Sequence, residues 1–277
     1  MKHVVICDSG LGGLNVASGL FNAREGEVCD VIYFNAYPAR GGGFNTLPTD
    51  RAREELLRDV LEAMKRFSPD LCLVACNTLS IVWEQLKTWY TPPFPVTGIV
   101  DAAAEGLFTV LERDPGSSLL ILGTKTTAAS GVYTERLIRR GVAPGRLRAL
   151  ACPGLATLLE SAPAGPAAAA KIEGYAREAA ALFDEPPHHL YLGLCCTHFG
   201  FARPLWEKKF RRVFGPGVGI VDPNGLLQTG LRGKSFSYFS KIDFFDGARE
   251  NMCAYFKTKA PAIASALASA RPDPGLF

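Results

Sequence analysis

The most restrictive feature of this chain is a series of short, mainly apolar segments, rich in β-branched and aliphatic residues and separated by stretches long enough to form helices. These segments cover residues 3–7, 29–34, 71–75, 95–99, 118–122, 146–150, 190–195 and 218–221. Strands with one solvent-facing side alternate apolar and polar residues, whereas strands buried on both faces are apolar throughout. The pattern therefore predicts an α/β fold with mainly parallel central sheets covered by helices.

The clearest helix signal lies at residues 49–67. Apolar side chains recur there at positions 56, 57, 60, 61 and 64, a spacing typical of one buried helix face. Thr49 precedes the pattern and has a side chain suited to an N-cap. We expect a helix that begins just after Thr49.

The layout of the first half of the chain recurs in the second half. One strand ends at Asp8 and another at Cys76, 68 residues later, while Thr124 and Cys196 end two strands that are 72 residues apart. This spacing predicts two pseudo-symmetric α/β lobes. Because ligands bind at the carboxyl ends of strands in open parallel sheets, we expect the site in the cleft between the lobes.

Composition and charge exclude several classes of protein. With 48% hydrophobic residues the chain can bury a large core, and a net charge of +3 with a pI near 8.4 does not indicate a nucleic-acid partner. There is no signal-peptide segment and no apolar stretch of about 18 residues, so we expect a cytoplasmic protein without a membrane partner. Eight cysteines are too few for a disulfide scaffold of this size.

Two cysteines stand where an apolar strand gives way to a polar loop, in "DLCLVACNTLS" (70–80) and "LYLGLCCTHFG" (190–200). Cys76 and Cys196 are each followed by polar side chains: Asn77, Thr78, Thr197 and His198. Side chains alternate along an extended backbone, so Cys196 and His198 are expected to point the same way and Cys195 the opposite way. Both Cys76 and Cys196 are therefore candidate catalytic thiols.

A catalytic thiol needs a partner, because a cysteine with a pKa of about 8.5 is mostly protonated at pH 7. His198 is the candidate partner of Cys196, and Asp8 is the candidate partner of Cys76. The remaining strand and helix cysteines are expected to be small buried hydrophobic residues: Cys7, Cys29, Cys72, Cys152 and Cys253.

Cofactor and metal motifs are not matched. The glycine-rich loop 8–15 has Asn15 where a dinucleotide fingerprint needs its third glycine, and Gln228 stands where a P-loop needs its first. Four residues have side chains that could bind zinc but lack the usual Cys-x-x-Cys pairs: Cys72, Cys76, Cys196 and His198. We expect no cofactor and no metal.

Five segments, in this order and spacing, resemble the glutamate racemase family of the aspartate/glutamate racemase superfamily. They are "VVICDSGLGGLNV", "LVACNTLS", "ILGTKTTAASGVYTERL", "ALACPGLATLLESA" and "CCTHFGFARPL". The resemblance extends over about residues 3–231 and implies two α/β lobes with the active site between them. It places the first lobe at 1–97 and the second at 98–212, with 213–277 returning to the first lobe and ending in a helix.

The resemblance implies that Cys76 and Cys196 are the proton-transferring thiols, assisted by Asp8 and His198. It also implies which residues hold the amino and carboxylate groups of the substrate: Ser9, Asn77, Thr78 and Thr197, with Thr124 and Thr127 as further contributors. Racemisation without a cofactor requires one acid/base group on each face of the α-carbon, and two thiols meet this need. The implied activity is racemisation of glutamate, which supplies D-glutamate for peptidoglycan synthesis.

The sequence departs from the family in the segment "YFNAYPARGGGFNTLP" (33–48), where the family has a Gly-Asp pair followed by a Pro-Tyr-Gly turn. Gly42 and Gly43 are candidate donors of backbone amides to a substrate carboxylate. Because this loop differs, aspartate or another acidic amino acid is an alternative substrate, and a non-catalytic amino-acid-binding paralogue is an alternative of another class. The expected partners are an amino-acid substrate and a second copy of the chain in a homodimer.

Overall fold

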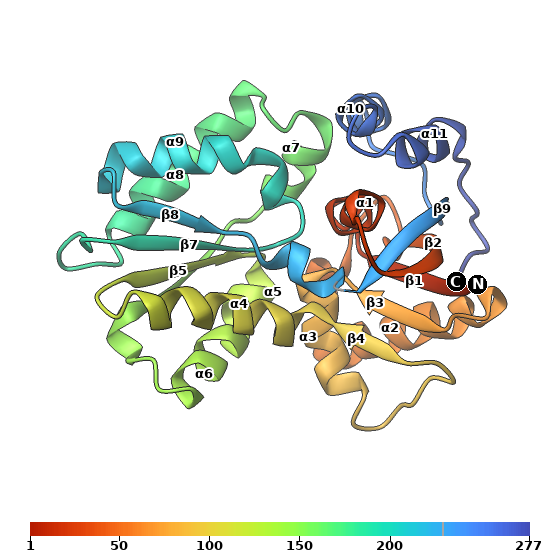
Figure 1. Cartoon of the computed structure of the whole chain (residues 1–277), viewed down its shortest axis with the longest axis horizontal. Coiled ribbons are helices and arrows are strands. Elements are labelled where there is room, and N and C mark those ends of the chain that lie inside the picture. Colours follow the sequence, from red (N-terminus) through yellow and green to blue (C-terminus); the bar gives the residue numbers. More distant parts are fainter. Residues whose placement is uncertain (229) are drawn as a thin grey trace.

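The structure, a computed structural model, describes residues 1–228 and 230–277. In this part of the chain the strands form two sheets, of order β4-β3-β1-β2-β9 and β6-β5-β7-β8, and every pair of neighbouring strands is parallel. Figure 1 shows the two sheets next to each other, each covered by helices on both faces. The predicted α/β fold with parallel sheets is confirmed.

The first sheet contains both the start and the end of the chain. Its strands are β1 (Lys2–Asp8), β2 (Glu27–Asn35), β3 (Leu71–Val74), β4 (Val96–Gly98) and β9 (Leu231–Ser240). One face is covered by α1 (Leu14–Asn22), α10 (Ala248–Phe256) and α11 (Pro261–Ser269), and the other by α2 (Asp50–Met64) and α3 (Asn77–Leu86) (Figure 1).

The second sheet is formed by the middle of the chain. Its strands are β5 (Ser118–Gly123), β6 (Leu147–Ala151), β7 (Leu190–Cys195) and β8 (Val218–Val221). Helices α7 (Leu155–Ser161), α8 (Pro166–Ala180) and α9 (Arg203–Phe214) lie on one side, and α4 (Ile99–Arg113), α5 (Lys125–Ala129) and α6 (Val132–Arg139) lie on the other (Figure 1).

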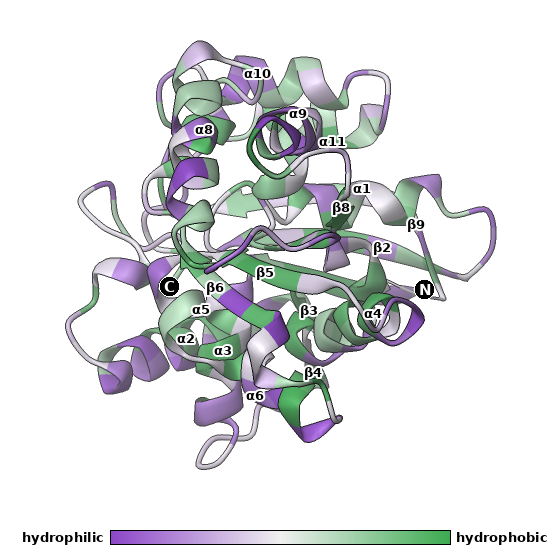
Figure 2. Ribbon diagram, turned by 90° about the vertical axis from the view of Figure 1, so that its left-hand side faces the viewer, coloured by the Kyte–Doolittle hydropathy of each residue, from purple (hydrophilic) through white to green (hydrophobic). Residues whose placement is uncertain are grey.

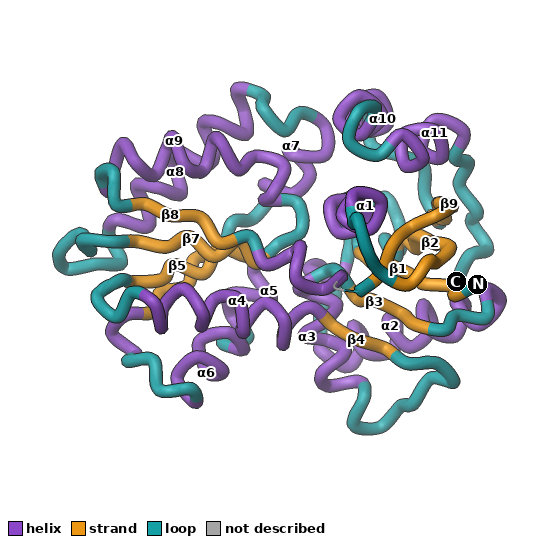
Figure 3. The backbone as a smooth tube through the Cα atoms, in the orientation of Figure 1, coloured by secondary structure: helices purple, strands orange, loops and turns teal. Residues whose placement is uncertain are grey.

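The chain crosses between the sheets at two places. It leaves the first sheet through β4 and α4, and its return begins with the 3-10 segment η5 (Pro223–Gln228) (Figure 3). Strand β8 pairs with β7, so the second sheet extends past residue 212, where we predicted the second boundary. A division that follows the sheets would change lobes near residue 98, as predicted, and again after Val221. We therefore propose Val221 as the second boundary in place of residue 212.

Helix α2 agrees with the sequence pattern. The side chain of Thr49 accepts a hydrogen bond from the amide of Ala52, as expected of an N-cap, and the buried residues are Leu57, Val60, Leu61 and Met64. After Met64 the predicted helix tightens into a 3-10 turn over 65–67, and Ser68 ends it in the left-handed conformation with φ of 47°. Such a residue terminates the helix because its backbone cannot continue the right-handed turn.

Strand β9 was not predicted from the sequence. Its residues alternate between buried or half-buried and exposed positions, as expected of an edge strand with one solvent-facing side, and so lack the continuous apolar run used to find the other strands. Tyr238 of β9 stacks on Tyr33 of β2 with ring centroids 5.7 Å apart, which fixes the strand on the sheet. The sequence predicts that segment 213–277 ends in a helix, and two helices follow β9 there, α10 and α11.

Apolar residues fill the space between each sheet and its helices. Figure 2 shows strand β5 as hydrophobic along its length, whereas hydrophilic residues gather on outer helices such as α9. Leu107 of α4 and Ile121 of β5 belong to the same buried cluster as Val4 of β1, so one core continues across both sheets. Among the described residues, no helix combines the length and the apolar character needed to cross a bilayer.

Candidate active site

A cavity of about 340 Å³ lies where the carboxyl ends of strands from both sheets meet. The first sheet contributes the loops after β1, β2 and β3, and the second sheet contributes the loops after β5, β6 and β7. The structure brings nine of the predicted site residues into its wall: Ser9, Gly43, Cys76, Asn77, Thr78, Thr124, Cys196, Thr197 and His198. Its size is typical of a small-molecule site.

Cys76 enters the cavity from the first sheet. It follows β3, occupies the N-cap position of α3 and is 7% exposed. Its sulfur lies 3.1 Å from the hydroxyl oxygen of Ser9. Burial, followed by the negative charge of Asp8, raises the pKa of Cys76 to about 12, so this residue is a neutral thiol near pH 7.

Cys196 enters the same cavity from the second sheet, directly after β7. Its sulfur lies 3.7 Å from Nδ1 of His198, and Nε2 of that imidazole lies 2.6 Å from Oε1 of Glu160. Burial lowers the pKa of His198, but the contacts with Cys196 and Glu160 raise it by more, so the net pKa lies well above its ordinary value. The imidazolium is held between a carboxylate and a sulfur, an arrangement that stabilises a thiolate.

Glu160 is a site residue that sequence reasoning missed. It lies in α7, is 6% exposed, and its Oε1 also accepts a hydrogen bond from the amide of Leu11, 2.8 Å away in the first sheet's loop. A lone acidic residue in "LATLLES" is consistent with a solvated helix position, and this made it inconspicuous. The one signal in the sequence was that Glu160 follows leucines expected to be buried. A carboxylate in such a position needs a partner, because unpaired carboxylates are rarely buried.

Asp8 lies behind the cavity wall rather than in it. It is fully buried, and its Oδ2 accepts a hydrogen bond from the hydroxyl of Thr197, 3.0 Å away, while Oδ1 has no partner within the described residues. Burial raises its pKa to about 6, although the charge of His198 and the bond from Thr197 act in the opposite direction. The hydrogen-bonding neighbour of Cys76 is thus Ser9, and not Asp8 as the sequence suggested.

Polar side chains from both sheets meet beside Cys76. The hydroxyl oxygens of Thr78 and Thr124 are 2.9 Å apart, which links the start of α3 to the start of α5. The hydroxyl of Tyr133 donates to Oδ1 of Asn77, while Nδ2 of Asn77 is buried without a partner in the described part of the chain. Thr127 supports Thr124 from 3.1 Å but does not line the cavity.

The divergent loop forms an aromatic part of the wall. Rings of Tyr37 and Phe44 face the cavity together with Phe245 from the segment after β9, and Tyr37 packs edge-on against Phe245 at 5.5 Å between centroids. Gly43 lines the cavity, but Gly42 does not, and its amide already donates to the carbonyl of Ala39. Gly42 is therefore not available as the carboxylate donor that the sequence suggested.

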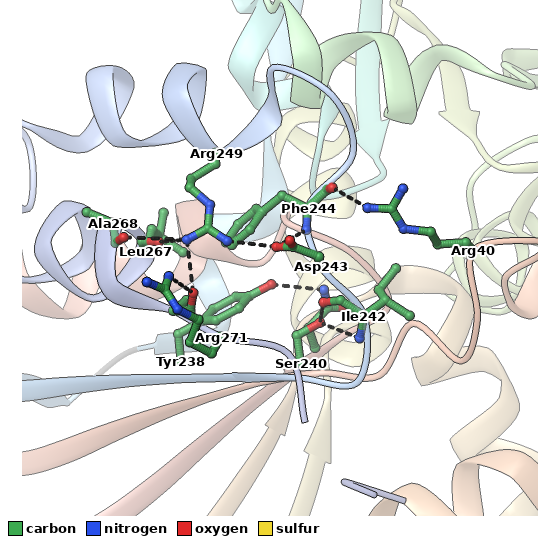
Figure 4. A network of polar contacts seen from close by, with 12 residues as sticks. Arg40, Tyr238, Ser240, Ile242, Asp243, Phe244, Arg249, Leu267, Ala268 and Arg271 are labelled. Carbon is green, nitrogen blue, oxygen red and sulfur yellow. Dashed lines mark hydrogen bonds and ion pairs between the residues drawn. The ribbon is translucent and has the colours of Figure 1, made fainter. Parts of the chain in front are cut away.

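A network of polar contacts holds this loop against the end of the chain (Figure 4). Arg40 donates to the carbonyl of Phe244, 3.1 Å away. On the other side of this segment, Arg249 pairs with Asp243 at 2.7 Å and donates to carbonyl groups at the end of α11. The position of Phe245 in the cavity wall thus depends on helices that follow β9.

The glycine-rich loop after β1 serves close packing between the two sheets. A side-chain carbon placed on Gly12 would lie 2.7 Å from the backbone nitrogen of His198 and would also contact Thr197. Only glycine permits this approach. The motif that resembled a nucleotide-binding loop is explained by the proximity of the His198 segment.

The other cysteines are distributed as follows. Cys72 donates to the sulfur of Met64 at 3.8 Å in the core of the first sheet, so it does not share a metal site with Cys76 and Cys196. The described residues contain no group of three His, Cys, Asp or Glu side chains placed to hold a metal. Cys152, expected in the core, is buried but also lines the cavity.

Comparison with known proteins identifies the family. Residues 32–227, more than half of the chain, match the Asp/Glu/Hydantoin racemase family. The chain belongs to this racemase family. Similar members include the glutamate racemase of Streptococcus equi subsp. equi, 30% identical over 226 residues that cover 80% of this chain and 76% of the relative. The glutamate racemase of Aquifex aeolicus is also 30% identical, covering 82% and 81%.

Solved racemase structures share the fold. The crystal structure of glutamate racemase from Campylobacter jejuni superimposes with a TM-score of 0.69 at 22% identity, covering 93% of this chain and 99% of that one. That of the glutamate racemase isoform RacE1 from Bacillus anthracis gives 0.71 at 19% identity, covering 92% and 94%. At these identities, the similarity shows that the fold is shared.

Proposed function

We propose that this protein is a cofactor-independent glutamate racemase that interconverts L- and D-glutamate by proton transfer between two cysteines. The observation that supports this most directly is that Cys76 and Cys196, one from each sheet, line the same cavity. Relatives that are 30% identical over four fifths of the chain are glutamate racemases, which favours glutamate over aspartate. A homodimer and a cytoplasmic location stay predictions from the sequence.

The proposed reaction has two balanced steps. The thiolate of one cysteine removes the α-proton, which leaves a carbanion and converts that cysteine to a thiol. The thiol of the other cysteine then gives its proton to the opposite face of the α-carbon and becomes a thiolate. The roles are exchanged for the other enantiomer, so both cysteines serve as acid and as base.

The surrounding residues supply the electrostatics. As the carbanion forms, negative charge spreads into the α-carboxylate, where the unpartnered amide of Asn77 and the hydroxyls of Thr78 and Thr124 can donate hydrogen bonds. His198 stabilises a thiolate at Cys196. Burial disfavours the thiolate of Cys76, and the ammonium group of a bound amino acid would place a positive charge near it and so favour the thiolate.

Exchange with heavy water tests this proposal. In D₂O, glutamate incubated with the protein should acquire deuterium at the α-carbon in the product enantiomer, detected by NMR. Cys76→Ser and Cys196→Ser should each stop racemisation, because a serine hydroxyl is too weak an acid to replace the thiol. Cys195→Ala is the matched control, since Cys195 packs in the core cluster on the other face of β7.

The outcomes separate the alternatives. Faster racemisation of aspartate than of glutamate would support the other acidic substrate. No deuterium incorporation with any amino acid would support a binding protein without turnover. Activity that survives Cys196→Ser but not Cys195→Ala would show that the second thiol is assigned wrongly.

A further inference from the structure

Of the charged side chains in the cavity wall, two form an ion pair with each other and one has no acidic partner in the described part of the chain. Within the described residues the wall contains Lys125, Glu160 and His198. Glu160 and His198 form an ion pair at 2.6 Å and are buried. Lys125 has no carboxylate within 4.0 Å in the described part of the chain, so its positive charge is available to a ligand.

Lys125 stands next to the polar groups of the site. It is the first residue of α5 and directly follows Thr124, whose hydroxyl contacts Thr78 beside Cys76. It also borders a surface groove of about 560 Å³ that adjoins the cavity, and Asn45 of the divergent loop borders both spaces as well. Lys125, at the start of α5, and Asn45, in the divergent loop, therefore both lie where the cavity meets the groove.

The other charges of the groove are already paired. Ion pairs join Arg53 with Asp50, Glu84 with Arg136, and Glu135 with Arg139. Arg53 also donates two hydrogen bonds to loop carbonyls, which leaves it committed to the protein. Among the described residues that border the cavity or the groove, Lys125 is the cation left without an acidic partner.

An acidic amino acid carries two carboxylates, and the site offers them different hydrogen-bond donors. Neutral donors from Asn77, Thr78 and Thr124 are grouped beside Cys76, where the α-carboxylate has to lie for the α-carbon to reach a thiol. The side-chain carboxylate then needs another donor. The amide of Gly42 is engaged within its own loop, and Gly43, which lines the cavity, has only a neutral amide to offer. A charged donor binds a carboxylate more strongly than a neutral one.

We propose that Lys125 binds the side-chain carboxylate of the substrate and is the residue that makes the site specific for acidic amino acids. This proposal rests on the proposed racemase function for its choice of ligand. Asn45, which borders the same two spaces, is placed to contact the same end of the ligand.

Calorimetric titration with DL-glutamate and DL-glutamine tests the proposal, because glutamine has the same shape without the negative charge and a racemic mixture undergoes no net reaction. The unmodified protein should bind glutamate about tenfold more tightly than glutamine. Lys125→Met should remove this preference, and Lys125→Arg should retain most of it. Lys208→Met is the control, because Lys208 is an exposed lysine on α9 that borders neither space.

The outcomes distinguish this proposal from the racemase proposal. A glutamate preference that Lys125→Met abolishes supports the role of Lys125 even if the protein shows no deuterium exchange, in which case only the racemase function fails. A preference that survives in Lys125→Met overturns the proposal. So does an equal loss of affinity for both ligands, or an unmodified protein that does not distinguish them.

Discussion

Nε2 of His198 lies 2.6 Å from Oε1 of Glu160, and this pair joins the loop after β7 to helix α7 behind the sulfur of Cys196. The carboxylate also accepts the amide of Leu11, so one buried oxygen connects the two sheets. Together with the contact to Cys196, this pair raises the pKa of the imidazole and so sets the environment of one proposed catalytic thiol.

Replacement of Glu160 by glutamine should lower the pKa of His198 and reduce racemisation by about tenfold to a hundredfold, because the imidazole loses its anionic partner. The pKa of His198 is raised in the folded protein, so the pair stabilises the fold below the ordinary histidine pKa and this contribution is lost as pH rises through the folded pKa. The free energy of unfolding should therefore differ most between variant and unmodified protein near pH 5.5. Denaturant titrations at pH 5.5 and pH 9 measure this, and an equal difference at both values would contradict it.

Asp8 should make the fold less stable as the solution becomes less acidic. Its pKa of about 6 is raised above its ordinary 3.8, so its contribution to stability is complete below about pH 4 and is lost as pH rises to about 6. Relative to Asp8→Asn, the unmodified protein should lose about 2 to 3 kcal/mol of unfolding free energy across this interval. Unfolding of both proteins at pH 4, 5, 6 and 7 gives the difference directly, and a constant difference would refute the expectation.

Gly12→Ala should abolish activity, because the added carbon would push against the backbone of His198 and against Thr197. Gly174→Ala is the matched control: Gly174 lies on the exposed side of α8 with no atom within 4 Å of the added carbon. The control should retain activity and gain about 0.5 to 1 kcal/mol of stability, as glycine disfavours a helix relative to alanine. Full activity in Gly12→Ala would show that the sheets do not require this close approach.

Arg53→Met should loosen the divergent loop. The Arg53 guanidinium donates to the carbonyls of Phe44 and Leu47 at 3.0 and 2.7 Å, and Phe44 lines the cavity. We expect the unfolding free energy to fall by about 1 to 2 kcal/mol and KM for glutamate to rise about tenfold. Arg58→Met, which removes an exposed pair with Asp59, should change stability by less than about 0.5 kcal/mol and leave KM unaltered. A stability loss without a change in KM would show that these hydrogen bonds stabilise the loop but do not position it for substrate binding.

The local sequence determined most of the fold. Eight strands were predicted from their continuous apolar runs, and helix α2 was predicted from its periodicity and the N-cap at Thr49. These features depend on residues close together in the chain, since burial on both faces and helical periodicity leave a local pattern. Strand β9 escaped because an edge strand alternates polar and apolar residues, and its place on the sheet depends on pairing with β2, which is about 200 residues away.

For the site, the sequence alone determined that Cys76 and Cys196 end strands and that polar residues follow them, because the carboxyl ends of parallel strands form one edge of a sheet. Only the tertiary structure decided which side chains meet there. Three features arise from the way two sheets and their helices pack: the pairing of Glu160 with His198, the placement of Phe245 in the wall, and the position of Lys125 in the wall without an acidic partner among the described residues. Such contacts join segments that are far apart in the chain, so they leave no periodic pattern in the sequence of either segment.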